Sequence, residues 1–327
     1  MDYRKLGSSG IEVSTVAFGA WAIGGWMWGG TDESQAIAAI HAGLDHGVNL
    51  VDTAPSYGFG LSEEIVGRAI RDRRDKVVLA TKCGMVWDRE EGEFQTYSNE
   101  YGVTSEPSLR KIYRNQRPEV IRQELDRSLK RLQVTHIDLY QTHWQDTTTP
   151  LAETMGELLR LKQEGKIRAI GVSNVNLAQL TDYGPIDADQ ERYSLLDRDI
   201  EKNGILPYCR EHRIAMLPYS PLAHGLLTGK LRPDRQYGQG DLRAESRRFS
   251  ADNVERINRM LQAIQPIADR HGLTLAQLVI AWTASQPGIT SVLCGARTPQ
   301  QAIENAAAGS VQLSVDELHA IERAVHV

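Results

Sequence analysis

Short apolar and β-branched runs alternate with stretches of helical periodicity along the whole chain, and this alternation restricts the possible folds more than any other feature. It is typical of repeated βα units, whose strands pair in parallel. Eight runs stand out, at residues 15–18, 50–52, 77–82, 136–143, 169–173, 188–193, 215–219 and 291–295. Eight parallel strands with intervening helices close into a barrel. We therefore predict an α/β fold, a (β/α)8 TIM barrel that forms a single domain over residues 1–327.

Two prolines mark expected helix starts. Pro118 precedes an apolar stripe of helical spacing, and Pro150 repeats the arrangement, so each is predicted at a first helical position. Before the first barrel strand, residues 2–6 and 11–13 flank a glycine-bounded turn at residues 7–10. This pattern predicts an N-terminal β-hairpin that plugs the bottom of the barrel.

Two polar segments do not fit the repeat. Residues 84–117 follow the third predicted strand, and residues 232–248 follow the seventh. Both fall on the side of the barrel where the strands end and where such folds build their sites. We expect two long βα loops there, since long loops at this end are commonly functional.

The composition excludes several partners. The 37 basic and 42 acidic residues give a net charge of -5, which provides no attraction to a polyanion. The N-terminus resembles no signal peptide, and no stretch reaches the roughly 20 apolar residues of a membrane span. We expect a cytoplasmic protein without nucleic-acid or membrane partners, and we treat it as a monomer. Cys83, Cys209 and Cys294 match neither a disulfide framework nor a zinc site, so we interpret them as buried apolar residues.

Four polar side chains lie at or just after the ends of three neighbouring predicted strands. Asp52 leaves the second strand in VDTAPSY, with Tyr57 five residues later; Lys82 ends the run VVLATK, and His143 ends DLYQTH. The carboxyl ends of parallel barrel strands converge. A lysine at the end of a buried strand must be paired or functional, because an unpaired buried ammonium is costly. These residues therefore predict one site.

The four residue types suggest a proton relay. An ammonium lowers the pKa of a nearby tyrosine from its usual value of about 10, so we expect Lys82 to tune Tyr57. Asp52 would hold the lysine, and His143 would donate a hydrogen bond to a substrate oxygen. The chain has no HExxH, GxSxG or CxxC motif, so we expect no metal, and the electron pair must come from a cofactor. A Schiff-base role for Lys82, as in an aldolase, remains an alternative.

Six segments carry a resemblance to a known family: VDTAPSYGFGLSEEIVGRAI, KVVLATKCG, IDLYQTHW, GKIRAIGVSN, LPYSPLAHGLLTGK and CGARTPQQAIEN. In this order, across nearly the whole chain, they resemble the aldo-keto reductase superfamily, and most of all its bacterial branch of general stress proteins and inositol-utilisation reductases. The resemblance implies an NADP(H)-dependent oxidoreductase that reduces an aldehyde or ketone, sugar-like ones included. Tyr57 would be the general acid, Lys82 and Asp52 its modulators, and His143 the group that positions the carbonyl. A redox-sensing accessory subunit with little turnover remains the alternative.

The same resemblance implies the cofactor-binding residues. Ser173, Asn174 and Gln190 are similar to the residues that hold the nicotinamide carboxamide, and Tyr219 to the residue that stacks on the ring. Along the pyrophosphate we expect Ser220, Leu222, Gly225, Leu227 and Thr228. At the adenosine end we expect Gly295, Arg297, Gln301, Glu304 and Asn305.

Arg297 bears on the choice of coenzyme. It directly precedes Thr298-Pro299, a strong helix start, so its forked donors and free backbone N–H groups are expected to face a 2'-phosphate. Gly295 and Gln301 replace cations that are common in relatives, and we therefore expect NADP(H) with some use of NAD(H).

The substrate is expected to be a small carbonyl compound. Five tryptophans fall near the predicted strand ends: Trp21, Trp26, Trp28, Trp87 and Trp144. They would either form the walls of the substrate pocket or simply cover the mouth of the barrel.

Overall fold

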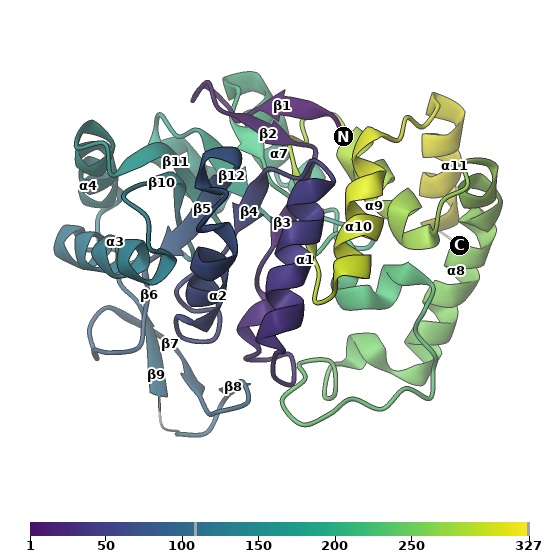
Figure 1. The fold of residues 1–327 in the computed structure, drawn as a ribbon, viewed down its shortest axis with the longest axis horizontal. Coiled ribbons are helices and arrows are strands. Elements are labelled where there is room, and N and C mark those ends of the chain that lie inside the picture. The colour runs from purple at the N-terminus through teal and green to yellow at the C-terminus, as the bar shows by residue number, and fades with distance from the viewer. Residues whose placement is uncertain (108–109, 326–327) are drawn as a thin grey trace.

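The main sheet forms a barrel. The protein, described by a computed structural model over residues 1–107 and 110–325 (Figure 1), has eight parallel strands in the order β13-β12-β11-β10-β5-β4-β3-β14. Backbone hydrogen bonds of 2.9 Å from Thr290 to Met216 and from Leu293 to Pro218 join the two outer strands. The predicted (β/α)8 fold is thereby confirmed. Its strands are β3 (Val16–Gly19), β4 (Leu50–Asp52), β5 (Val78–Cys83), β10 (Ile137–Thr142), β11 (Ile167–Ser173), β12 (Ala188–Gln190), β13 (Ala215–Met216) and β14 (Val292–Gly295).

Helices surround this barrel (Figure 1). Pro118 is the first residue of its helix, as predicted, whereas Pro150 lies one position before its helix and has an extended backbone. Within the described residues, no helix has the length and apolar character needed to cross a membrane. The helices are α1 (Glu33–Asp45), α2 (Leu61–Ile70), α3 (Pro118–Leu132), α4 (Leu151–Gln163), α5 (Leu177–Tyr183), α6 (Asp199–Lys202), α7 (Ile205–His212), α8 (Ala251–Arg270), α9 (Leu275–Ser285), α10 (Pro299–Ala307) and α11 (Val315–Val325).

The N-terminal hairpin closes one end of the barrel. Its strands, β1 (Tyr3–Lys5) and β2 (Glu12–Ser14), are antiparallel. Leu6, Ile11 and Val13 are buried in a cluster with side chains from the inner face of the barrel, namely Ala17, Leu50, Ala80, Leu139, Ala169, Ala188, Ala215, Leu217 and Leu293. The many alanines leave room for the hairpin side chains, and the predicted plug is confirmed.

We predict that Leu6→Ala lowers the free energy of unfolding by about 2–5 kcal/mol, because it leaves a cavity in this fully buried cluster. Urea unfolding followed by circular dichroism measures the change. Val315→Ala, at a side chain that is 66% exposed, is the matched control and should change stability by less than about 0.5 kcal/mol. Equal stability of the two variants would contradict the plug.

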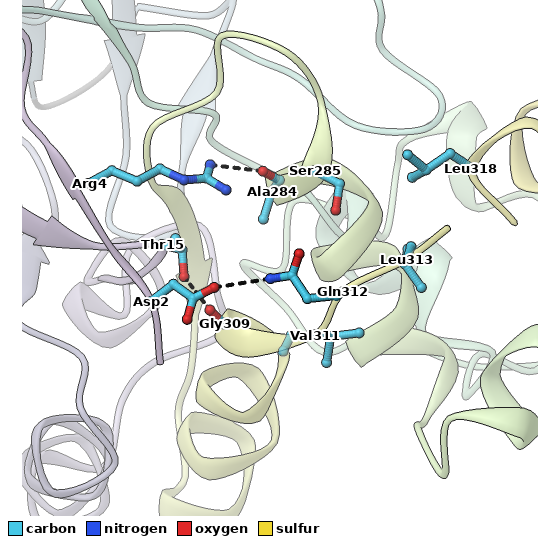
Figure 2. A pocket seen from close by; sticks show the side chains of 11 residues that line it. Asp2, Arg4, Thr15, Ala284, Ser285, Gly309, Val311, Gln312, Leu313 and Leu318 are labelled. Atoms are coloured by element: carbon cyan, nitrogen blue, oxygen red, sulfur yellow. Dashed lines mark hydrogen bonds between the residues drawn. The ribbon is translucent and has the colours of Figure 1, made fainter. Parts of the chain in front are cut away.

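Figure 2 shows a pocket of about 240 Å3 beside the hairpin. The Arg4 guanidinium donates a 2.8 Å hydrogen bond to the Ala284 carbonyl, and Gln312 donates one of 3.1 Å to Asp2. Thr15, which immediately precedes β3, also lines this pocket. The pocket therefore lies at the amino ends of the strands, where its hydrogen bonds tie the hairpin to the C-terminal segments.

Residues 84–117, expected as a long loop, hold a small sheet instead. Its four antiparallel strands have the order β6-β9-β7-β8 and are β6 (Met85–Val86), β7 (Glu93–Ser98), β8 (Val103–Thr104) and β9 (Arg110–Arg114). Residues 108 and 109 of this segment lie outside the described residues. Residues 232–248 lack such a sheet, but Asp241 forms an isolated bridge with Trp28. Both segments lie at the end of the barrel opposite the hairpin (Figure 1).

Candidate active site

Adjacent strands bring the four predicted polar residues together. The strands β4, β5 and β10 are neighbours in the sheet, and Asp52, Lys82 and His143 lie at or just after their carboxyl ends. The Lys82 Nζ atom lies 2.6 Å from Asp52 Oδ2 and 3.2 Å from the Tyr57 hydroxyl. The rings of Tyr57 and His143 meet edge to face, with 5.6 Å between centroids.

The Lys82–Asp52 pair is buried and fully bonded. The third Lys82 partner is the Thr53 carbonyl at 3.0 Å, while Asp52 Oδ1 accepts hydrogen bonds from Gln141 (3.1 Å) and Gln190 (2.9 Å). Burial alone would lower the pKa of Lys82, but Asp52 and the Tyr57 oxygen outweigh it and the pKa is raised. Lys82 therefore stays an ammonium at neutral pH.

The pKa of Tyr57 differs from the expectation. We predicted that Lys82 lowers it, but burial of the phenol is the largest effect and raises the pKa above its ordinary value. Lys82 opposes this shift, and Asp52, which carries a negative charge, adds to it. Tyr57 is consequently a protonated phenol at neutral pH, in contact with a permanent cation.

His143 is held as a neutral imidazole. Burial lowers its pKa well below the ordinary range, and the charge of Lys82 adds to this effect. Its Nδ1 atom lies 3.3 Å from the Ser56 hydroxyl. Among the described residues, the other ring nitrogen has no hydrogen-bond partner, so it remains available to a bound molecule.

Asp52, Tyr57 and His143 line a cavity of about 670 Å3 at the mouth of the barrel. The structure brings most of the other predicted residues to the same cavity: Trp21, Trp26, Trp28, Trp144, Ser173, Asn174, Gln190, Tyr219, Ser220, Leu222, Gly225, Thr228, Gly295, Arg297, Gln301, Glu304 and Asn305. Two of the predicted residues are not among those that line this cavity. Trp87 packs against Phe59, with ring centroids 5.2 Å apart, and Leu227 is fully buried in the hydrophobic core.

The residues predicted to hold a carboxamide form a connected group. Tyr219 donates a 2.8 Å hydrogen bond to the Asn174 side chain, which in turn donates one of 2.9 Å to the His143 carbonyl. Ser173 donates to the Gln190 carbonyl at 2.7 Å. The Gln190 amide, however, points its N–H toward Asp52, so this side chain also supports the Lys82–Asp52 pair.

The Arg297 guanidinium is not free, contrary to our expectation. It donates hydrogen bonds of 3.0 Å to the Trp28 carbonyl and 2.6 Å to the Gly30 carbonyl. Its backbone N–H, also expected to be free, donates to the Gln301 side chain at 2.8 Å. The carbonyls of the first βα loop thus occupy two donors that we had assigned to a phosphate.

Several site residues were not predicted. Gln141 lies on β10, two positions before His143, which directly follows this strand, so strand alternation could have revealed it. Lys230 pairs with Glu304 at 2.9 Å, and Arg192 follows Gln190 by two positions. Arg235 and Arg243 come from the segment 232–248, whose sequence carries no periodic signal.

The charge of the cavity favours an anionic ligand. Five cationic side chains line it, Arg192, Lys230, Arg235, Arg243 and Arg297, against the two carboxylates Asp52 and Glu304. This excess occurs in a chain of net charge -5, so it is specific to the cavity. Together with the flat face of Tyr219 and the amide of Asn174, these groups fit a dinucleotide, whose phosphates are anionic and whose terminal rings are aromatic.

Comparison with known proteins agrees with this geometry. The model of the "Aldo/keto reductase family" matches residues 15–326. An NADH-specific methylglyoxal reductase of Escherichia coli (strain K12) is 42% identical, with 94% of each chain covered. Among solved structures, a glycerol dehydrogenase from Gluconobacter oxydans superposes with a TM-score of 0.84 at 39% identity, over 96% of this chain and 92% of that one. An aldo-keto reductase from Klebsiella pneumoniae in complex with NADPH has a TM-score of 0.72 at 29% identity, over 99% and 95% of the chains.

Proposed function

Because the chain belongs to the aldo/keto reductase family of oxidoreductases, we propose that it reduces an aldehyde or ketone to an alcohol, with Tyr57 as the proton donor. The single observation that carries the proposal is the chain of contacts from Asp52 through Lys82 to the Tyr57 hydroxyl. These contacts lead to the cavity that Tyr219 and Asn174 also line.

The four residues divide the proton chemistry between them. The hydride for the carbonyl carbon would come from a nicotinamide coenzyme, held by the residues that line the cavity. Tyr57, a protonated phenol, gives its proton to the carbonyl oxygen, and the adjacent Lys82 ammonium stabilises the phenolate that is left. Asp52 fixes the lysine, while the neutral His143 offers its unbonded ring nitrogen to orient the substrate oxygen. The raised pKa of Tyr57 suits this role because the acid must carry its proton at neutral pH.

The geometry disfavours a Schiff-base mechanism. A lysine nucleophile must lose its proton, but the pKa of Lys82 is raised. Asp52, Thr53 and Tyr57 also occupy its three N–H donors. We therefore do not propose an aldolase.

Both NADP(H) and NAD(H) are proposed as coenzymes. The cationic side chains that line the cavity and the start of α10 favour NADP(H). The NADPH complex of the Klebsiella pneumoniae relative also supports NADP(H). The absence of cations at Gly295 and Gln301 favours NAD(H), as does the NADH-specific relative. A direct comparison of kcat/KM for the two coenzymes with one carbonyl substrate decides their order.

We predict that reduction depends little on pH. Between about pH 6.5 and pH 9, kcat/KM should change less than roughly twofold, because His143 stays neutral and Tyr57 stays protonated across this range. Activity is expected to fall at alkaline pH only where Tyr57 loses its proton. The profile of carbonyl reduction at saturating coenzyme provides the measurement, and an acid limb centred near the ordinary histidine pKa of about 6.5 would contradict it.

A panel of carbonyl compounds tests the proposed function. The panel should include methylglyoxal, aromatic aldehydes and open-chain sugars, since Trp21, Trp26 and Trp144 give the cavity flat apolar walls. Consumption of NADH and NADPH is followed in parallel with product analysis. Absence of turnover on every compound would favour the accessory-subunit alternative over the reductase.

A further inference from the structure

The segment after β3, residues 25–31, crosses the mouth of the barrel; we call it the roof loop. In the barrel, β14 lies between β3 and β13. The roof loop, which follows β3, nevertheless reaches the segment that follows β13. The Met27 carbonyl accepts a 3.0 Å hydrogen bond from the Leu242 N–H, and the Gly29 N–H donates one of 3.3 Å to the Gly240 carbonyl. Both partners lie in the segment 232–248, which follows β13. The roof loop therefore spans the carboxyl end of β14, above the part of the cavity lined by Gly295.

Arg297 holds this loop from the β14 side. Its two terminal nitrogens reach the carbonyls of Trp28 and Gly30, and hydrogen bonds from a guanidinium are stronger than those between neutral groups. The third attachment is a 3.0 Å hydrogen bond from the Met27 N–H to the Tyr101 carbonyl, beside the small sheet. Of these three attachments, only that of Arg297 is made by hydrogen bonds from a side chain. The Trp28 ring also packs against Trp21 and His224 and lies under the Arg243 guanidinium.

The closed loop is poised to open. Within residues 1–107 and 110–325, the buried indole N–H groups of Trp26 and Trp28 have no hydrogen-bond partner, and unsatisfied buried donors are costly. Gly25 and Gly30, near the ends of the loop, have positive φ values of 76° and 90°, which glycine adopts without steric strain. Opening would return the indoles to water, so the Arg297 bonds offset a real cost in the closed state.

We propose that Arg297 is the latch that closes the roof loop over a bound coenzyme, and that it governs the release of NADH and NADPH alike. The inference rests on the proposed function, because it takes a nicotinamide coenzyme as the occupant of the cavity. Arg297 is then a positioning residue that acts through the loop. This role differs from direct binding of a 2'-phosphate, which would affect the release of NADPH alone.

Two measurements on Arg297→Ala test the latch. Hydrogen exchange of the coenzyme-free protein reports on the loop, since the backbone N–H groups of residues 27–30 are hydrogen-bonded; we expect exchange there to quicken by about tenfold to a hundredfold. Stopped-flow displacement then measures release of NADH and of NADPH. Both release rates should rise by a similar factor of about ten or more.

Arg192→Ala provides the matched control. Arg192 lines the same cavity, and among the described residues its side chain has no hydrogen bond or ion pair, so the variant removes an equal charge without touching the loop. Loop exchange should remain unchanged in this variant. Unaltered exchange in Arg297→Ala, or faster release of NADPH with unaltered release of NADH, would overturn the latch. If the native protein binds neither coenzyme, the proposed function fails, whereas the exchange measurement still decides whether Arg297 holds the loop.

Discussion

Tyr57→Phe is expected to depress carbonyl reduction by roughly 10²–10⁴-fold, the usual contribution of a positioned general acid. The hydroxyl, which contacts Lys82, is the only group removed, and the ring that packs against His143 is kept. Coenzyme affinity should change by less than about threefold, since the hydroxyl is not among the groups that we assign to the coenzyme. Single-turnover reduction at saturating coenzyme measures the first quantity, and fluorescence titration measures the second.

Ser56→Ala is a suitable control for this variant. Ser56 also lines the cavity and touches His143 at 3.3 Å, but it donates no proton in the proposed reaction. We expect it to reduce activity far less than Tyr57→Phe. Tyr57 would lose its role if the Phe variant retained the native rate.

Lys82→Met is expected to impair both stability and activity. It leaves Asp52 as a buried carboxylate without its cation, and breaking a buried pair in this way costs about 3–5 kcal/mol. Reduction should fall at least about a hundredfold, because the phenolate of Tyr57 loses the charge that stabilises it. Urea unfolding and steady-state kinetics on the same preparations measure the two effects.

The double variant Asp52→Asn/Lys82→Met separates the two effects. Without the carboxylate no uncompensated charge remains, so most of the lost stability should return, while activity should stay as low as in Lys82→Met. If the double variant regained activity, Lys82 would act only through the fold. If Lys82→Met were as stable as the native protein, the Lys82 charge would not be needed to compensate the buried Asp52 carboxylate.

The barrel and its central site were predictable because strong local patterns encode them. Each barrel strand is a short apolar run, and strand ends such as Asp52 and Lys82 converge by topology alone. The N-terminal hairpin was marked by its glycine-bounded turn. Gln141 was also predictable, since it lies two positions before His143 and an extended chain places such residues on the same side.

The remaining features depend on contacts between distant segments. The strand β7 pairs with β9 through a register shift between Phe94 and Thr96, which no alternation in the sequence announces. Arg297 binds backbone carbonyls, and these carry no residue-specific signal. The pKa of Tyr57 is set by the balance of burial against the Lys82 charge, and sequence patterns do not quantify burial.

Tracing the hydride tests the central claim most directly. The native protein and Tyr57→Phe are each given a carbonyl substrate and NADH or NADPH that carries deuterium at both hydrogen positions of the reactive carbon of the nicotinamide ring. Mass spectrometry of the alcohol then reports the transfer. We predict one deuterium on the carbinol carbon of the product formed by the native protein and a yield at least about a hundredfold lower with Tyr57→Phe. Alcohol formed without deuterium, or labelled equally well by both proteins, would contradict the account.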